Sequence, residues 1–473
     1  MHRPTLARRS AAALLIGATT ALGACSADRL TAANRNQPSV ASATTDPNAV
    51  QFAVTGIVAA NRNQLDDYVR DIGIFGRENF NYTQTEGRNT SGFLQNFNDP
   101  AGFASGLWAG RYQNLRNIFN LSRVVEQSTA LSAAQKSATQ GFLRTFEALE
   151  LHYVVATRHN LGAVVELRED PLDLAPFVSR DSTYGYIVGR LDQGNTLLGQ
   201  GGDAFPFALT SGFGGFSTPT TFRQFNRAIY ARVQAWRGSL GCGAPCYQAA
   251  LTALGQTWLD PAGDLQRGVY ATYSTAAGDA TNASNTFGGA ARVIVGHPSI
   301  VADAPRKADG TPDNRFAAKI TTLATPQNAP GSGIGIATNV GVTRYPAQDT
   351  PVPIIKNEEL ILLRAEARYF TGDVAGALAD INTIRTRSGG LAAIAQAQIA
   401  TRDQFVTELL LQRRLSLFME GHRWIDVRRF GRLDTLPRDL PTHRVAEQMV
   451  VPQGECLVRR NTGNQALFGP GCP

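Results

Sequence analysis

Large apolar and aromatic side chains recur at helical spacing over long parts of this chain, and this spacing limits the available folds more than any other feature. Residues at offsets 0, 3 or 4, 7, 11 and 14 lie on one face of a helix with 3.6 residues per turn. The expected core stripes are Trp108, Tyr112, Leu115 and Phe119; Phe142, Phe146, Leu149 and Tyr153; and Phe222, Phe225, Ile229, Val233 and Trp236. The pattern predicts a mainly all-α fold in which these stripes form the core and bind no cofactor.

The clearest pair of helices is expected within residues 356–388. Gly372 and Asp373 form the turn between the two helices, and Gly389 follows the second helix as a stop signal. Alanines at facing positions allow two antiparallel helices to approach closely, which is typical of a tetratricopeptide unit. Apolar residues line both helices: Leu360, Leu363, Ala367 and Phe370 in the first, and Val374, Ala377, Leu378, Ile381 and Ile384 in the second.

Further helices of the same kind are expected on either side of a set of long insertions. One segment covers residues 401–431, where Thr401 and Gln404 have the spacing of a capping box. Less regular pairs are expected at 107–125 with 138–157, and at 181–198 with 221–237. The predicted fold is therefore all-α, with tetratricopeptide-type helical pairs interrupted by long loops.

The first 24 residues have the composition of an export signal. Arg3, Arg8 and Arg9 precede an apolar run over 11–21 that is too short to span a bilayer. The run ends in Leu-Gly-Ala before Cys25, which resembles the lipobox of bacterial lipoproteins, where the cysteine becomes the acylated first residue. Residues 1–24 are therefore interpreted as a lipoprotein signal peptide and Cys25 as the lipidation site. An ordinary signal peptide followed by a chance cysteine is the alternative.

The remainder divides into a tether and a body. Residues 25–48 are rich in Ala, Ser, Thr and Asn, which predicts a flexible tether. Residues 49–473 form the predicted folded body. The formal net charge of +7 falls to about +4 without the leader arginines. This charge is too small and too dispersed to indicate nucleic-acid binding.

Four cysteines remain in the body. Cys242 and Cys246 lie close together, and Cys456 and Cys472 lie near the end of the chain. In an oxidising envelope two local disulfides, 242–246 and 456–472, are expected. A four-cysteine zinc site is the alternative, but the two pairs lack the tight spacing of zinc ribbons.

Residues 76–106 and 260–350 are long insertions that show little helical period. Loops of such length are usually functional. Both contain aromatic residues among polar ones, an arrangement suited to stacking on the apolar face of a sugar ring. Tyr82, Tyr270 and Tyr273 are the candidate ligand-binding residues, each with a ring and a hydroxyl. The alternative is that these aromatics only pack the loops onto the helices.

Motifs of known enzyme classes are missing from the sequence. The glycine-rich segment 331–335 fits neither a serine nucleophile elbow nor a dinucleotide fingerprint. The histidines include no His-Glu-x-x-His pair, and no pair of carboxylates is singled out for glycoside hydrolysis. We therefore expect no catalytic residue, no metal and no cofactor.

Residues 409–431, LLLQRRLSLFMEGHRWIDVRRFG, resemble the C-terminal signature of the SusD/RagB nutrient-uptake family. Gln412 and Ser416 depart from the family pattern, which usually has glutamates there. The charged residues alternate in sign at helical spacing, so we interpret them as a structural ion-pair cluster. The matching positions are Arg413, Arg414, Phe418, Glu420, Gly421, Arg423, Asp426, Arg429, Phe430 and Gly431. Weaker similarities occur in the family's order over most of residues 50–435.

The resemblance implies a helical body with a loop-built ligand structure on one side. It also implies a non-catalytic lipoprotein of the cell outer membrane, anchored by lipid at the cell surface. Such a protein binds an oligomeric nutrient, glycan or peptide, and delivers it to a TonB-dependent outer-membrane transporter, for which it acts as a lid. A helical-repeat scaffold for protein interactions in the cell envelope is the alternative function.

Overall fold

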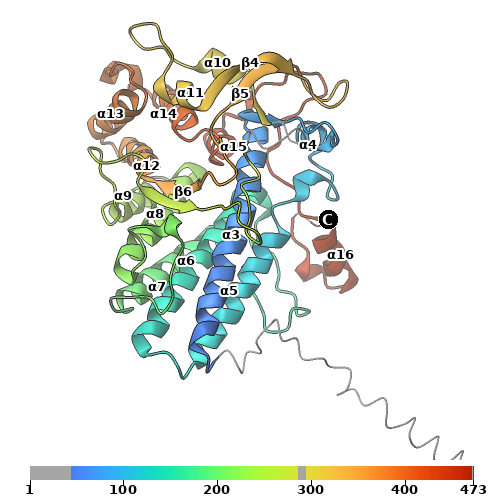
Figure 1. Ribbon diagram of the computed structural model, residues 1–473, viewed down its shortest axis with the longest axis vertical. Coiled ribbons are helices and arrows are strands. Elements are labelled where there is room, and N and C mark those ends of the chain that lie inside the picture. Colours follow the sequence, from blue (N-terminus) through green and yellow to red (C-terminus); the bar gives the residue numbers. More distant parts are fainter. Residues whose placement is uncertain (1–43, 286–293, 471, 473) are drawn as a thin grey trace, which may run out of the picture.

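The computed structural model describes residues 44–285, 294–470 and 472. Four long helices run side by side in Figure 1, and α3 continues from them into the upper part of the molecule: α3 (Pro47–Phe75), α5 (Ala109–Gln127), α6 (Ala133–Arg158) and α7 (Arg180–Gly199). Helix α3 begins just before the expected end of the tether at residue 48. The predicted signal peptide and Cys25 lie outside the described residues.

A second group of helices completes the helical body, as the all-α prediction expects. It contains α8 (Pro219–Arg237), α9 (Ala244–Leu254), α12 (Asn357–Phe370), α13 (Val374–Thr383), α14 (Arg402–Ser416) and α15 (Arg423–Arg429). Successive helices pack as pairs, α8 with α9 and α12 with α13. The mainly helical fold and the helix pair within 356–388 are thereby confirmed.

Local sequence signals set where several helices begin. At the start of α14, Thr401 Oγ1 accepts a hydrogen bond from the Gln404 backbone N–H at 3.2 Å, and the Gln404 side chain accepts one from the Thr401 N–H at 3.0 Å. This is the predicted capping box. Ser132 and Gln135 form the same arrangement at the start of α6. Each box satisfies backbone donors that the first turn of a helix leaves without partners.

The two long insertions contain short strands that join in one antiparallel sheet. Its strand order is β1 (Asn79–Asn81), β3 (Ile294–Gly296), β5 (Thr338–Val342) and β4 (Ile320–Gln327). The first insertion therefore pairs directly with the second, and the labelled strands β4 and β5 of this sheet lie at the top of Figure 1. Short helices accompany this sheet: α4 (Arg88–Leu94), α10 (Ser299–Asp303) and α11 (Asn314–Lys319).

A separate two-stranded ribbon links the insertions to the helical body. Strand β2 (Gly268–Ala271) pairs antiparallel with β6 (Val352–Lys356), and β6 continues directly into α12. Short 3-10 or π turns complete the described structure: Phe103–Ser105, His159–Leu161, Ser211–Phe213, Gly238–Cys242, Ile384–Ser388, Gln396–Ile399, Leu433–Thr435 and Gln465–Leu467.

Residues 437–449 form an extended strap that crosses the start of the first insertion. Arg77 donates from Nε to the carbonyl oxygen of Pro437 at 3.0 Å and from Nη2 to that of Arg444 at 2.7 Å. The backbone N–H of Arg444 donates to Leu94 O at 2.8 Å. Hydrogen bonds with the strap therefore hold the segment that follows α3 in place.

The four cysteines of the body form the two expected pairs. Cys242 is bonded to Cys246, and Cys456 to Cys472. The second bond attaches the tail to α16 (Gln453–Asn461), which lies at the right of Figure 1. Within the described part of the chain, no helix combines the length and apolarity that crossing a bilayer requires.

Candidate functional site

A pocket of about 400 Å³ lies where α3 meets the β2–β6 ribbon, and we call it the α3 pocket. Its volume lies within the range of ligand sites, roughly 300–1,000 Å³. Apolar groups and polar groups both line it, as in most small-molecule sites. The apolar side chains are Val58, Ala59, Phe146, Phe213, Tyr270, Ala271 and Ile354, and the polar ones are Thr55, Asn61, Arg62, Thr210, Thr272 and Asp279.

Tyr270 is the one predicted ligand residue that lines the α3 pocket. The residue lies on β2 and is partly exposed, whereas its β2 neighbours Val269 and Ala271 are buried. Its hydroxyl donates to the carbonyl oxygen of Gln266. This hydrogen bond fixes the ring, so Tyr270 offers the pocket a preformed aromatic surface.

Arg62 provides the main charged group of the α3 pocket. Its Nη2 lies 2.7 Å from Asp279 Oδ1, and its Nη1 donates to Thr272 O at 3.2 Å. The Arg62 side chain is 14% exposed and that of Asp279 is 38% exposed. A half-buried ion pair beside an aromatic ring can hydrogen-bond the hydroxyl groups of a ligand. Sequence reasoning missed both residues, because Arg62 lies within a helix and Asp279 lies 217 positions later in a loop.

Tyr82 and Tyr273 do not form the open platform that the sequence suggested. Tyr82 is fully buried, its ring stacks on Phe80 with 5.1 Å between centroids, and its hydroxyl donates to Ile336 O at 2.6 Å. Tyr273 is 6% exposed and donates to Arg62 O at 3.0 Å. Tyr82 therefore joins the two insertions, and Tyr273 supports the helix position that carries Arg62.

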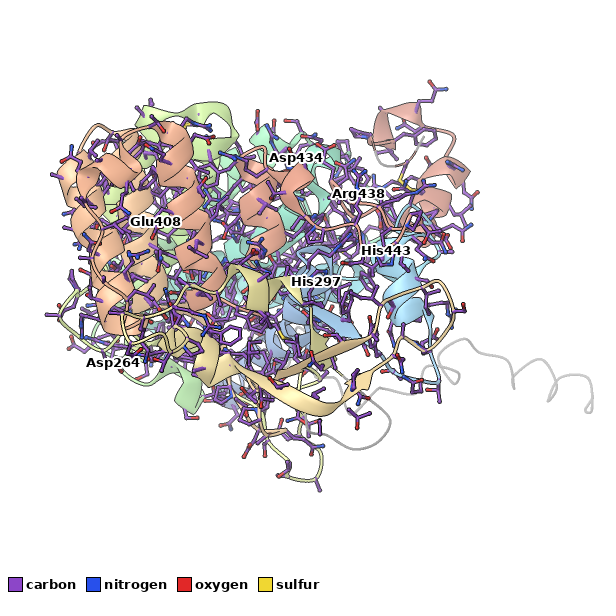
Figure 2. All side chains as sticks on the ribbon, turned by 90° about the horizontal axis from the view of Figure 1, so that it is seen from above. Asp264, His297, Glu408, Asp434, Arg438 and His443 are labelled. Carbon is purple, nitrogen blue, oxygen red and sulfur yellow. A yellow bond between two sulfur atoms is a disulfide. The ribbon has the colours of Figure 1, made fainter. Side chains whose placement is uncertain are left out.

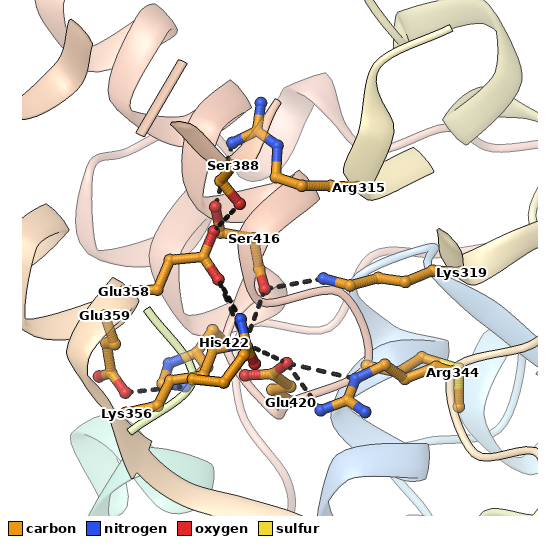
Figure 3. A network of polar contacts seen from close by, with 12 residues as sticks. Arg315, Lys319, Arg344, Lys356, Glu358, Glu359, Ser388, Ser416, Glu420 and His422 are labelled. Atoms are coloured by element: carbon orange, nitrogen blue, oxygen red, sulfur yellow. Dashed lines mark hydrogen bonds and ion pairs between the residues drawn. The ribbon is translucent and has the colours of Figure 1, made fainter. Parts of the chain in front are cut away.

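A second pocket, of about 410 Å³, is lined by charged and polar side chains, and we call it the cationic pocket. It shares no lining residue with the α3 pocket. Figure 3 shows that its charged side chains belong to several separate elements. Its principal lining residues are Arg315 and Lys319 of α11, Arg344 after β5, Lys356 of β6, Glu358 of α12, and Ser388.

Glu358, which lines the cationic pocket, and Glu420, which lies behind it, pair with the cations of the pocket. Glu420 Oε1 lies 2.7 Å from Lys356 Nζ and 3.0 Å from Arg344 Nη2. Glu358 Oε2 lies 3.5 Å from Lys356 Nζ, and Glu358 Oε1 accepts from Ser388 Oγ at 2.5 Å. Both carboxylates are 2% exposed, so their positions are fixed by these partners.

Lys319 stands apart from these ion pairs. Its Nζ donates to Leu415 O at 2.7 Å and to Ser416 O at 2.8 Å, at the C-terminal end of α14 (Figure 3). Burial, assisted by the nearby charge of Lys356, lowers the pKa of Lys319 to about 7. Sequence reasoning did not identify this lysine, because its surroundings come from segments about 100 positions apart.

The signature segment 409–431 forms a buried ion-pair network, in line with its structural interpretation. Asp426 lies 2.7 Å from Arg413 Nε and 2.9 Å from Arg429 Nε, and Arg429 also pairs with Glu366. Arg423 behaves differently, since no ion pair of its side chain occurs among the described residues. Burial lowers the pKa of Arg423 to about 9.

Two histidines and one aspartate join the strap to the second insertion. Figure 2 shows His297 and His443 near each other. His297 Nε2 lies 3.0 Å from Asp439 Oδ2, and His443 Nδ1 lies 3.6 Å from the same oxygen. The backbone N–H of Ser299 donates to His297 Nδ1 at 3.1 Å, which places the ring proton on Nε2, facing Asp439. These contacts hold the strap against the second insertion. In the described ranges, no cluster of three or more His, Cys, Asp or Glu side chains could hold a metal ion.

Comparisons with known proteins agree on one family. Residues 302–462 match the family model described as the SusD family. No curated protein matches the sequence. Similar solved structures include a SusD superfamily protein from Bacteroides vulgatus, with 15% identity and a TM-score of 0.66 over 90% of this chain and 99% of the other.

Two further structures extend this likeness. A SusD-like protein from Bacteroides fragilis has 17% identity and a TM-score of 0.67, covering 88% of this chain and 96% of the other. Surface glycan-binding protein A from Bacteroides thetaiotaomicron, in complex with laminarihexaose, has 14% identity and a TM-score of 0.65, covering 90% and 99%. At these identities the likeness to solved structures is one of fold.

Proposed function

Starting from the fact that this chain belongs to the SusD family, we propose that it is a surface glycan-binding protein whose main ligand site is the α3 pocket. A relative with the same fold is described as a surface glycan-binding protein bound to laminarihexaose. As a SusD family member, the chain binds its ligand without chemical turnover.

The observation that carries this proposal is the combination of groups in the α3 pocket. Tyr270 supplies an aromatic face, and the Arg62–Asp279 ion pair supplies donors and acceptors beside it. Sugars have a relatively apolar face and a rim of hydroxyl groups, so both kinds of group find partners. The polar rim is extended by Thr55, Asn61 and Thr272.

The first test is binding of the purified full-length protein to a panel of neutral oligosaccharides that begins with laminarihexaose. Tyr270→Ala is expected to weaken binding of the recognised glycan about tenfold, since one ring contact contributes about 1.5 kcal/mol. Tyr270→Phe retains the ring and is expected to bind more tightly than Tyr270→Ala. Calorimetric titration measures all three dissociation constants.

Tyr230→Ala is the matched control, because Tyr230 is a partly exposed tyrosine of α8 outside both pockets. This control is expected to bind like the wild type. Equal affinities of the wild type and Tyr270→Ala would refute the assignment of the site to the α3 pocket. Release of cleaved glycan in proportion to added protein would contradict the non-catalytic function.

The proposal includes a lipid anchor at Cys25 and a TonB-dependent transporter as the partner that receives the ligand. Acyl chains hold a protein to a membrane by roughly 0.8 kcal/mol per buried CH₂ group. Cys25→Ala is therefore expected to move the protein from the membrane fraction to the soluble fraction when the transporter is absent. Equal membrane retention of the variant and the wild type would contradict the anchor. Co-purification of the wild type with a TonB-dependent transporter tests the partner.

A further inference from the structure

We propose that the cationic pocket is a second binding site, which takes a carboxylate group of a ligand. The inference starts from the charges around the pocket. Four cationic side chains line it, and only one carboxylate does. The pocket is separate from the α3 pocket, so this site is additional to the proposed neutral glycan site.

Three of the four cations already have carboxylate partners. Arg315 binds Asp313 with Nη2 at 2.6 Å and Nε at 3.0 Å. Arg344 and Lys356 share Glu420, as described above. These cations are neutralised within the fold, so none of them requires a ligand.

Lys319 is the cation that the fold leaves without a counter-ion. Within the part of the chain that the structure describes, no carboxylate lies within 4.0 Å of its Nζ. The ammonium group has three donors, and two of them are used by Leu415 O and Ser416 O. The third donor is available to a ligand in the pocket that Lys319 lines.

An incoming carboxylate would remove an electrostatic cost. The ammonium group of Lys319 is partly buried and has no carboxylate close to it, and this loss of hydration agrees with its lowered pKa. Glu358 and Glu420 also attract Lys319, but neither lies within 4.0 Å of its Nζ, and both are paired with Lys356. A ligand carboxylate beside Lys319 would form a charge-assisted hydrogen bond in a partly enclosed site, where such bonds are strong.

Two sources can supply this chemistry, an acidic sugar and the C-terminal carboxylate of a peptide. The pocket volume of about 410 Å³ admits a monosaccharide or a short peptide end. Glucuronate with glucose as its neutral counterpart tests the first source. N-acetyl-dialanine with its C-terminal amide tests the second source. Binding of either acid above its neutral counterpart supports the proposal and identifies the source.

The experiment measures the four dissociation constants by calorimetry with the full-length protein at pH 6. Lys319→Met removes the charge and keeps the chain length. It is expected to weaken binding of the recognised acid by about tenfold or more, the scale of one hydrogen bond to a charged group. Lys136→Met is the matched control, because Lys136 also donates to a backbone carbonyl, that of Glu126, but lines neither pocket.

A pH series with the wild type provides a measurement that needs no variant. The chain has four lysines, so 13C labelling of the lysine ε position resolves Lys319. Without ligand it is expected to titrate near pH 7, and saturation with the acid is expected to raise the midpoint. Affinity should therefore fall as the pH rises above 7. The charged groups around Lys319 are Arg315, Arg344, Lys356, Glu358, Glu420 and Glu78, and of these Glu78 also has a pKa of about 7, so the titration of Lys319 is followed on its own ε carbon.

Three results would overturn the proposal. One is the absence of binding by both acids, and another is equal binding of each acid and its neutral counterpart. The third is a Lys319 titration midpoint that does not move when an acid is bound, which would place that acid elsewhere. These results leave the neutral glycan test at Tyr270 unaffected, so the two proposals fail independently.

Discussion

Replacing Asp426 with Asn tests whether the signature segment stabilises the fold through its charges. Asp426 is 3% exposed and accepts from Arg413 at 2.7 Å and from Arg429 at 2.9 Å. In Asp426→Asn, Arg429 retains Glu366, but Arg413 loses its one carboxylate partner among the described residues. An unpaired buried charge costs 3–5 kcal/mol. Because one of the two arginines stays paired, we expect a loss of about 3 kcal/mol.

Urea denaturation at pH 7, followed by circular dichroism, measures this loss from the shift in midpoint at constant slope. Burial alone would raise the pKa of Asp426, but Arg413 and Arg429 outweigh it and lower this pKa. The stabilisation is therefore complete at pH 7 and is lost as the pH falls through the folded-state value. The loss in Asp426→Asn should shrink accordingly under acidic conditions.

Asp173→Asn is the control for an exposed ion pair. Asp173 lies 2.6 Å from Arg168 but is 58% exposed, and such pairs contribute at most about 1 kcal/mol. If Asp426→Asn costs no more than Asp173→Asn, with unchanged slope, the charges of the signature segment do not hold the fold together.

Three other substitutions test single features of the structure by the same denaturation measurement. Glu78 is fully buried, and burial, opposed by Arg423, raises its pKa to about 7. The contribution of Glu78 to stability should therefore increase as the pH falls from 8 to 5, so Glu78→Gln should be more stable than the wild type at pH 8 and lose this advantage towards pH 5; a difference between the two proteins that does not change with pH would contradict this. Thr401→Ala removes the α14 cap and should cost about 1 kcal/mol, whereas Thr401→Ser should cost less. Gly421 has φ of 82°, and an added Cβ would clash with the ring of Tyr68. Gly421→Ala should therefore destabilise the protein more than Gly454→Ala, whose Cβ would meet open space. Equal effects of the two substitutions would refute this.

Helical periodicity predicted the body well, because each stripe reports its own local packing. The alanines and glycines around Ala367 and Gly372 place α12 and α13 correctly without knowledge of distant residues. Tyr82 shows where this reasoning fails. Its polar neighbours Asn79 and Asn81 suggested an exposed loop, but both asparagines are buried on β1. Their side chains bond to nearby groups, and sequence composition does not distinguish this from exposure to solvent.

The two pockets were beyond sequence reasoning for a related reason. The α3 pocket depends on Arg62 meeting Asp279, and the cationic pocket depends on Lys319 reaching the end of α14. The spacing of neighbouring residues predicts neither contact, because each one joins segments that lie far apart in the sequence. Only Tyr270 was found beforehand, because its ring type alone made it a candidate.

The strap over Arg77 has a consequence for how the chain reaches its native state. Arg77 bonds to Pro437 and Arg444, which lie 360 and 367 positions away in the sequence. Contacts of such separation form late, because closing a long loop costs entropy before any contact compensates for it. The junction between α3 and the first insertion therefore stays incomplete until nearly the whole chain is available.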